Sequence, residues 1–311
     1  SSRHARITRT AISPRLATST FVNIRLTLQN MNSKETDNPK ATEKDPVFAR
    51  GEYLTKALKN KGFTSVSWIG ETGSTNDDLL EKTSGIDAGG RVLIADFQTS
   101  GKGRFDRKWV AEINTALLMS VSFSADAEKV NLGVFASGVA VASCTALRSL
   151  GFEQVRIKWP NDIVVETSSI GGQDKLAGVL AQSKLVRTRA SIVVGVGINV
   201  HPSSIRDVVT ERGVVSLSDL SKPPDRVHLA EVILSNLGDL DFQSPELWEN
   251  YRRLSGTIGQ DVRVTTHKAV LEGKAKDITQ FGSLLLEDYG GVVREVISGD
   301  FRNLIVQLDE K

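Results

Sequence analysis

Hydrophobic and polar residues alternate along most of the chain in stretches that predict strands and helices in turn. Short runs rich in Val, Ile and Leu predict buried strands at 91–97, 116–123, 155–159, 163–166, 175–183 and 191–200. Stretches with helical spacing lie at 52–61, 132–150, 226–239 and 245–254. We therefore expect a mixed sheet packed with helices, an α+β fold, over residues 50–256.

The pattern changes after Gly256. Short strands separated by Gly and Asp are expected at 261–265, 268–276, 283–287, 291–296 and 301–308. Evenly spaced short strands are typical of a small β-barrel, so residues 257–311 are expected to form a second, C-terminal domain.

Residues 1–34 differ in composition from the rest of the chain. They contain no acidic residue but carry arginines among many serines and threonines. Such a leader is typical of an organellar transit peptide, which predicts a plastid or mitochondrial location, with a cytoplasmic protein carrying a plain polar tail as the alternative. Residues 35–46 are polar and mixed in charge, so we assign 1–49 to a transit peptide and a disordered linker.

Composition excludes several classes of protein. The formal net charge of +2 argues against a protein that binds nucleic acid, where a strong basic excess is expected. Cys144 is the single cysteine and the four histidines are scattered, so neither a disulfide scaffold nor a metal site is predicted. The apolar stretch Leu132–Leu147 is shorter than a bilayer span and is expected to be a buried helix, with no membrane partner.

Five segments carry residues suited to a ligand site, and the first is Gly-Ser-Thr-Asn-Asp at 73–77. A strand at 64–69 is expected to end in a turn at Gly70–Gly73, which brings Ser74, Thr75 and Asn76 to a helix N-terminus. Free backbone N–H groups there suit a small polar or anionic ligand, although a plain helix cap has the same pattern.

The second segment is a basic loop from Gln98 to Trp109, directly after a buried strand. Glycines at 101 and 103 allow a ligand to approach the backbone closely. The loop cations are Lys102, Arg104, Arg107 and Lys108. Because the arginine fork suits carboxylates and phosphates, we expect an organised anion site here in preference to a solvated basic loop. The spacing matches neither a P-loop nor a dinucleotide-binding glycine motif.

The remaining segments are Lys-Trp-Pro-Asn-Asp at 158–162, Lys-Leu-Ala-Gly-Val-Leu at 175–180 and Gly-Val-Gly-Ile-Asn-Val at 195–200. Asn161 could read an adenine edge, but Asn-Asp is equally typical of a plain turn. Lys175 opens an apolar strand without an obvious acidic partner, so an anionic ligand would supply the missing charge, unless the lysine lies at an exposed strand end. The glycine pattern before Asn199 is weak by itself.

In order and content the five segments resemble the biotin protein ligase family. The resemblance covers about residues 64–311, and the stretch 273–300 looks like that family's small SH3-like domain. It implies a class II synthetase-like catalytic domain that uses ATP, with Mg²⁺ carried on it, to activate biotin as biotinyl-5′-AMP. The biotin is then transferred to a lysine of the biotin carboxyl carrier domain of acetyl-CoA carboxylase or a related carboxylase. A homodimer is compatible with this reading.

The resemblance also implies roles for particular residues. The implied biotin-binding residues are Ser74, Thr75, Asn76, Gln98, Lys102, Gly103, Arg104 and Lys175. The implied ATP- and adenylate-binding residues are Arg104, Arg107, Trp109, Asn161 and Asn199. The implied catalytic residues are Lys175, Arg104 and Asp162. Lys175 and Arg104 would stabilise charge between carboxylate and phosphate, and Asp162 would orient the site.

Two loop residues depart from the family pattern G-R-G-R-x-G-R-x-W. Lys102 replaces an arginine, which predicts weaker carboxylate binding, and Asp106 replaces a glycine, which affects the closed form of the loop. The loop is expected to be mobile when empty and ordered by ligand. The alternatives are a lipoate–protein ligase or octanoyltransferase, and a non-catalytic nucleotide- or protein-binding module.

Overall fold

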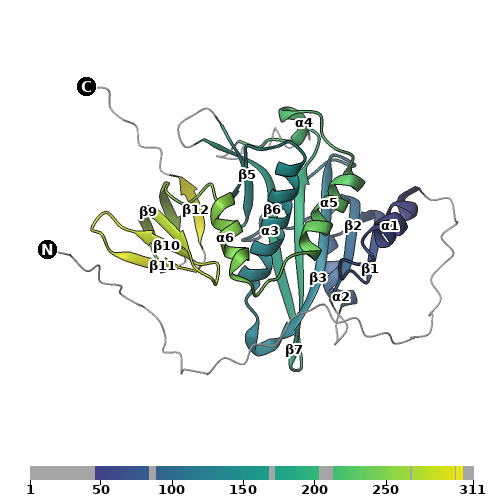
Figure 1. The fold of residues 1–311 in the computed structure, drawn as a ribbon, viewed down its shortest axis with the longest axis horizontal. Coiled ribbons are helices and arrows are strands. Elements are labelled where there is room, and N and C mark those ends of the chain that lie inside the picture. The colour runs from purple at the N-terminus through teal and green to yellow at the C-terminus, as the bar shows by residue number, and fades with distance from the viewer. Residues whose placement is uncertain are drawn as a thin grey trace.

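A computed structural model of the chain describes residues 46–83, 89–167, 172–202, 213–266, 268–297 and 299–303. The larger part is a seven-stranded sheet with the order β1-β2-β3-β7-β6-β5-β4 (Figure 1). The first two strands are parallel and the other neighbours antiparallel, so the predicted mixed sheet is confirmed. The predicted transit peptide lies outside the described residues.

The strands of this sheet agree closely with the predicted hydrophobic runs. They are β1 (Ser65–Thr72), β2 (Arg91–Gln98), β3 (Ala116–Asp126), β4 (Val155–Lys158), β5 (Asp162–Glu166), β6 (Gln173–Val186) and β7 (Arg189–Asn199). Strand β3 lies inside the sheet, between β2 and β7, and is buried along almost its whole length, which explains its continuous apolar sequence.

Helices cover the two faces of the sheet unequally. One face packs against α1 (Pro46–Ala57), α3 (Leu132–Ser149), α5 (Arg226–Gly238) and α6 (Pro245–Leu254) (Figure 1). The other face packs against α2 (Thr75–Lys82), where Leu79 meets Leu93 and Val193. Short helical turns lie at η1 (Ala127–Lys129) and α4 (Leu217–Leu220). The face that bears α2 is therefore open enough to hold a site.

Helix α3 is longer than the apolar stretch that predicted it. With 18 residues it meets the length and hydropathy of a membrane-spanning helix, so length alone does not exclude a span. However, 61% of it is buried inside the fold, against the sheet and helices α5 and α6. Its apolar sequence is thus explained by its place in the core.

The C-terminal part is an antiparallel sheet of short strands in the order β11-β10-β9-β8-β12. They are β8 (Asp261–Thr265), β9 (Val270–Ile278), β10 (Leu284–Glu287), β11 (Val293–Val296) and β12 (Asp300–Asn303). The predicted change to small all-β structure after Gly256 is confirmed. Val262, Ala275 and Leu284 belong to the same continuous buried cluster as the main sheet, so the two parts share a core.

Two predicted boundaries are wrong. Helix α1 begins at Pro46, within the predicted linker, and ends at Ala57; proline is well tolerated in the first turn of a helix. Strand β1 runs through Gly70 to Thr72, because the parallel pairing with β2 continues to Thr72 and Gln98. The turn before α2 is therefore shorter than the sequence predicted.

Candidate functional site

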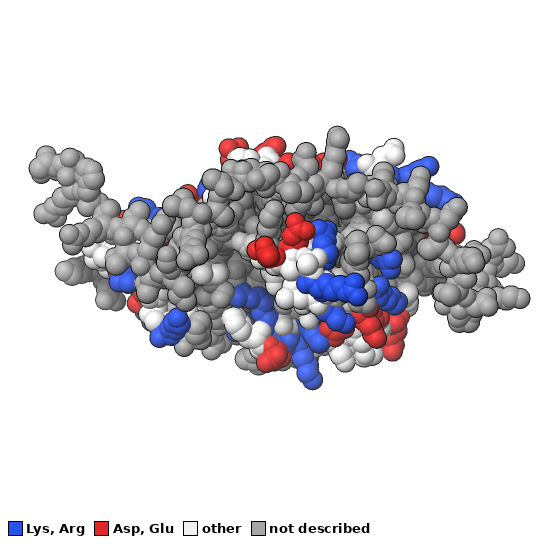
Figure 2. Space-filling view, turned by 90° about the horizontal axis from the view of Figure 1, so that it is seen from below, with Lys and Arg blue, Asp and Glu red and all other residues white. Residues whose placement is uncertain are grey.

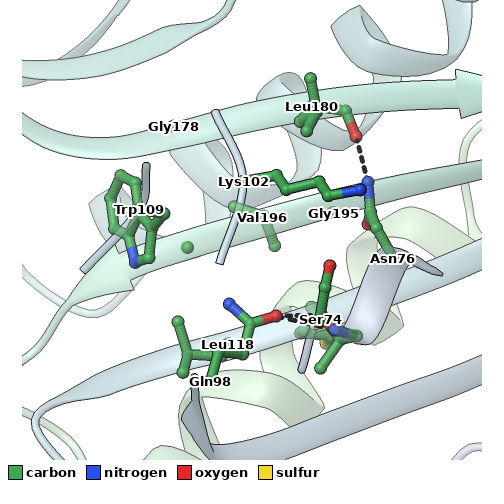
Figure 3. Close-up of a pocket in the computed structure, with 13 residues that line it drawn as sticks. Ser74, Asn76, Gln98, Lys102, Trp109, Leu118, Gly178, Leu180, Gly195 and Val196 are labelled. Carbon is green, nitrogen blue, oxygen red and sulfur yellow. Dashed lines mark hydrogen bonds between the residues drawn. The ribbon is translucent and has the colours of Figure 1, made fainter. Parts of the chain in front are cut away.

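A pocket of about 340 Å³, partly open to solvent, lies on the face of the sheet that bears α2 (Figure 3). The residues that line it come from the α2 N-terminus, the end of β2 and the loop after it, and strands β3, β6 and β7. They are Ser74, Thr75, Asn76, Gln98, Lys102, Trp109, Leu118, Met119, Leu180 and Val196, with glycines 178, 195 and 197. The structure thus brings the first two sequence segments together, with parts of the fourth and the fifth.

Hydrogen bonds hold the start of α2 against the end of β2. Ser74 is the N-cap residue, as predicted, and its hydroxyl accepts a long bond from the backbone N–H of Asp77, 3.5 Å away. The backbone N–H and hydroxyl of Thr75 both donate to Oε1 of Gln98, at 2.8 and 2.9 Å. The Gln98 amide nitrogen faces the open pocket, where it is available as a donor (Figure 3).

Asn76 is held by the strands on the pocket wall. Its Nδ2 donates to the Leu180 carbonyl at 3.1 Å and to Oε1 of Gln182 at 2.7 Å, and its Oδ1 accepts from the Ser120 hydroxyl at 2.7 Å. Because both amide protons are used within the protein, Asn76 fixes α2 to the sheet. The sequence pattern alone did not reveal Ser120 or Gln182.

The basic loop forms a short hairpin. Lys102 and Lys108 make an antiparallel bridge, and Phe105 and Asp106 sit at the turn with φ of 56° and 57°. Asp106 therefore occupies a left-handed position that glycine adopts most easily and that Asp tolerates. Lys102 Nζ lies 2.6 Å from Oδ2 of Asp77, so this cation bridges the hairpin to α2.

Trp109 ends the hairpin and lies flat on the β6 and β7 backbones. A Cβ placed on Gly197 would lie 2.6 Å from Cε2 of Trp109, and one on Gly178 would lie 3.2 Å from its Cζ3. The indole N–H is buried and has no hydrogen-bond partner among the described residues. It is a donor in the pocket wall, which a ligand acceptor would satisfy.

Two charged groups lie beside this pocket. Lys175 Nζ is 2.7 Å from Oδ1 of Asp162 and 5.7 Å from the centre of the Trp109 ring. Arg104 donates to Oδ1 of Asn161 at 3.0 Å. The expectation that Lys175 lacks an acidic partner is wrong: Asp162 comes from the neighbouring strand β5, a pairing that spacing along the chain does not reveal.

The other predicted residues lie further from the pocket. Gly103 and Arg107 form the hairpin backbone, where the Gly103 N–H donates to the Arg107 carbonyl at 2.7 Å, and the Arg107 side chain is exposed. Asn199 lines a second, smaller cavity with His201 and Ser216, and its Nδ2 donates to the Val215 carbonyl at 3.2 Å. That cavity adjoins the Lys175 strand, because the residue 175 and 215 backbones are hydrogen-bonded.

Two of the cations at the site are paired with carboxylates. Lys102 faces Asp77 and Lys175 faces Asp162. Basic and acidic side chains are likewise intermingled on the molecular face seen in Figure 2. Across the described ranges, no group of three or more His, Cys, Asp or Glu side chains is arranged to hold a metal ion.

Sequence comparison agrees with this architecture. Residues 71–199 match the model of the Biotin/lipoate A/B protein ligase family, and residues 257–302 match the Biotin protein ligase C terminal domain. The chain belongs to the biotin/lipoate protein ligase family.

Individual members of the family are similar to this chain over most of its length. The Biotin--[acetyl-CoA-carboxylase] ligase of Mycobacterium tuberculosis is 35% identical over 254 residues, 78% of this chain and 90% of that protein. The bifunctional ligase/repressor BirA of Escherichia coli is 27% identical over 76% of this chain and 73% of its own length. The solved structure of biotin protein ligase from Aquifex aeolicus in complex with biotin and ATP has a similar fold, with a TM-score of 0.62 and 24% identity over 76% of this chain and 97% of that one.

Proposed function

We propose that this chain is an ATP-dependent biotin–protein ligase. The observation that carries the proposal is the pocket on the α2 face, with Lys175 and Arg104 beside it. Gln98 and Trp109 supply uncharged donors, and Leu118 and Val196 supply apolar surface. Such a lining suits a compact ligand with an uncharged polar head and an apolar body, which describes biotin.

In the first step, a biotin carboxylate oxygen attacks the α-phosphorus of ATP, and the bond to pyrophosphate breaks. Both reactants are anions, so positive side chains must offset their repulsion. We propose that Lys175 and Arg104 do so; the proposal is supported by their contacts with Asp162 and Asn161, at 2.7 and 3.0 Å. Mg²⁺ arrives with ATP as part of the substrate, held by phosphates and water.

In the second step, the ε-amine of an acceptor lysine attacks the carbonyl carbon of biotinyl-5′-AMP. AMP leaves with the bond electrons, the amine loses a proton, and biotin remains in amide linkage. We propose a biotin carboxyl carrier domain as acceptor, so that the reaction activates a carboxylase. The similarity to the mycobacterial Biotin--[acetyl-CoA-carboxylase] ligase supports this choice.

The loop from Gly101 to Trp109 would exclude water from the reactive anhydride. Its hairpin already lies against the pocket, since Trp109 covers Gly197 and Lys102 pairs with Asp77. We also propose that residues 1–34 direct the protein to an organelle, on the strength of their acid-free, arginine-rich composition. A fluorescent protein fused after residue 49 should enter plastids or mitochondria, and a uniform cytoplasmic signal would contradict this.

The test of the proposed function is a streptavidin blot of a carrier domain incubated with the protein and biotin, with and without ATP. Signal should require ATP and should be lost in Lys175→Ala, because one preorganised charge commonly contributes about 10²- to 10³-fold in rate. Lys184→Ala, on the exposed part of the same strand, is the matched control and should retain activity. Transfer of lipoate in place of biotin would favour the lipoate ligase alternative.

A further inference from the structure

A tight turn of the C-terminal domain, residues 279–283, touches the catalytic domain directly. The Thr279 hydroxyl accepts from the backbone N–H groups of Phe281 and Ser283, each 3.2 Å away. Gly282 has φ of +83°, a conformation that favours glycine, and its N–H donates to the Thr279 carbonyl at 3.0 Å. The turn is therefore rigidly built, and the Gly282 carbonyl points in a defined direction.

That carbonyl accepts a hydrogen bond from Trp159 of the Lys-Trp-Pro-Asn-Asp segment. The distance from Trp159 Nε1 to the Gly282 oxygen is 2.8 Å, and the indole is 1% exposed. The backbone N–H of Trp159 also donates to the Thr257 hydroxyl at 2.9 Å. Two separate points of the C-terminal region thus hold one residue of the catalytic domain.

The residues that follow Trp159 hold the two cations beside the pocket. Residues 159–161 connect β4 to β5, with Lys158 and Asp162 as the last cross-strand pair. Asn161 accepts from Arg104, and Asp162 pairs with Lys175. Any displacement of Trp159 would therefore be passed along a short piece of backbone to both cation contacts.

We propose that Trp159 is a positioning residue through which the C-terminal turn fixes Arg104 and Lys175 for adenylate formation. This inference rests on the proposed function. The pocket contacts of Ser74, Thr75 and Gln98 involve other elements and do not pass through Trp159. The coupling should therefore affect the reaction of bound biotin with ATP and leave biotin binding itself unchanged.

Trp159→Phe tests the coupling, because it keeps a large ring and removes the N–H donor. Biotin-dependent ATP–pyrophosphate exchange at saturating substrates should fall about tenfold, as expected when a buried carbonyl loses its partner. The Kd of biotin, measured by calorimetry, should stay within about twofold. Trp248→Phe is the matched control: Trp248 packs against Gly282 from α6, and none of the hydrogen bonds that hold Trp159 in the described part of the chain comes from it, so exchange should be preserved.

Thr279→Val provides a second variant, which loosens the turn from the C-terminal side and leaves Trp159 intact. It should lower exchange in the same direction, and it decides the question if Trp159→Phe fails to fold. Exchange at the wild-type rate in the folded variants, or an equal loss of biotin affinity, would overturn the coupling.

Hydrogen–deuterium exchange gives a readout that needs no substrate. The Val179 N–H donates to the Asn161 carbonyl at 2.8 Å and so reports the position of the 159–162 turn. Its exchange should be faster in Trp159→Phe and Thr279→Val and unchanged in Trp248→Phe; unchanged exchange in all three would overturn the coupling. Absence of pyrophosphate exchange in the wild type, with this amide pattern intact, would refute only the proposed function.

Discussion

Glycines in the pocket wall allow neighbouring side chains to lie directly against the strand backbone. Gly195 lies directly beneath the Asn76 amide, and Gly197 lies beneath the Trp109 ring. An isolated glycine inside a strand is typical of close approach by another group. The Gly-Val-Gly pattern at 195–197 indicates such a close approach, but the sequence does not indicate which side chains approach.

We predict that Gly195→Ala weakens biotin binding about tenfold or more. The new Cβ would collide with Oδ1 of Asn76 and push the start of α2 away from the sheet, and overpacking of this kind commonly costs about 1–3 kcal/mol. Calorimetric titration with biotin measures the effect. Gly70→Ala is the matched control in β1, since no atom lies within 4 Å of its Cβ position. Equal affinities in the two variants would contradict the prediction.

Some contacts between residues at the site are predictable from the sequence, and others are not. Ser74, Thr75 and Gln98 lie together in the structure. Local features predict the helix N-terminus and the strand end separately, and only the family resemblance predicts that they share one site. The pairing of Lys175 with Asp162 depends on which strands are neighbours and in what register. That information comes from the sheet and not from spacing along the chain.

At the scale of elements, the basic hairpin is held by backbone hydrogen bonds but has a strained backbone at its turn. The Trp109 N–H donates to the Gly101 carbonyl at 2.9 Å, and the Arg107 N–H donates to the Arg104 carbonyl at 3.2 Å. The turn nevertheless places Phe105, an exposed aromatic residue, at a positive φ. A bulky residue in this conformation is unfavourable by about 1–2 kcal/mol, so the hairpin is poised to open.

Asp106→Val should open the hairpin further, because a β-branched residue is poorly tolerated at a positive φ. A strain of about 1–2 kcal/mol predicts tryptic cleavage between residues 102 and 108 that is about 5- to 30-fold faster. Asp106→Asn is the control, because it removes the charge but still tolerates the left-handed conformation, and it should be cleaved at the original rate. Similar cleavage of the two variants would show that charge, and not backbone conformation, matters at this position.

The elements themselves were largely predictable. The hydrophobic runs located every strand of the main sheet, since buried strands have continuous apolar sequences. The sequence predicts the start of helix α1 too late, because few of its residues are buried. Leu54 is buried within the helix, and Leu58 is buried just beyond its end. The sequence predicts the end of strand β1 too early, because glycine at position 70 is typical of a turn, whereas the pairing of β1 with β2 continues to Thr72.

At the scale of the whole molecule, a buried charged cluster joins elements distant in the sequence. Asp96 of β2 accepts from Trp68 of β1 at 2.9 Å and pairs with Arg50 of α1 and Arg226 of α5 at 3.2 and 2.8 Å. Both guanidinium groups lie over the Trp68 ring. A buried carboxylate with this many partners sets how the helices sit on the sheet, close to the loop that leads to Trp109.

Stability should fall as the pH rises above 9. Burial raises the pKa of the Cys144 thiol from 9.0 to about 12. Below pH 9 the thiol is protonated in both states; between about 9 and 12 only the unfolded chain releases the proton, so the free energy of unfolding falls by up to about 1.4 kcal/mol per pH unit.

Urea denaturation between pH 8 and 11 measures this slope, and Cys144→Ala should reduce it relative to the wild type. Burial, and to a smaller extent the charge of the nearby Cys144 thiolate, raises the pKa of the Tyr251 hydroxyl, which contributes in the same direction. The difference between the two slopes therefore measures the Cys144 thiol together with its effect on Tyr251. Parallel curves for wild type and variant would refute the assignment to Cys144.

The carboxylate of Asp162 beside Lys175 affects how strongly small anions from the solution bind at the site. A bare ammonium in a cleft attracts whatever small anion is abundant, such as free phosphate, chloride or acetate. Asp162 lies 2.7 Å from the Lys175 ammonium and acts as its counterion, so the attraction for these anions is largely cancelled before substrate binds. Only a molecule anchored elsewhere in the cleft can compete for the ammonium, so we expect common cellular salts to be weak inhibitors.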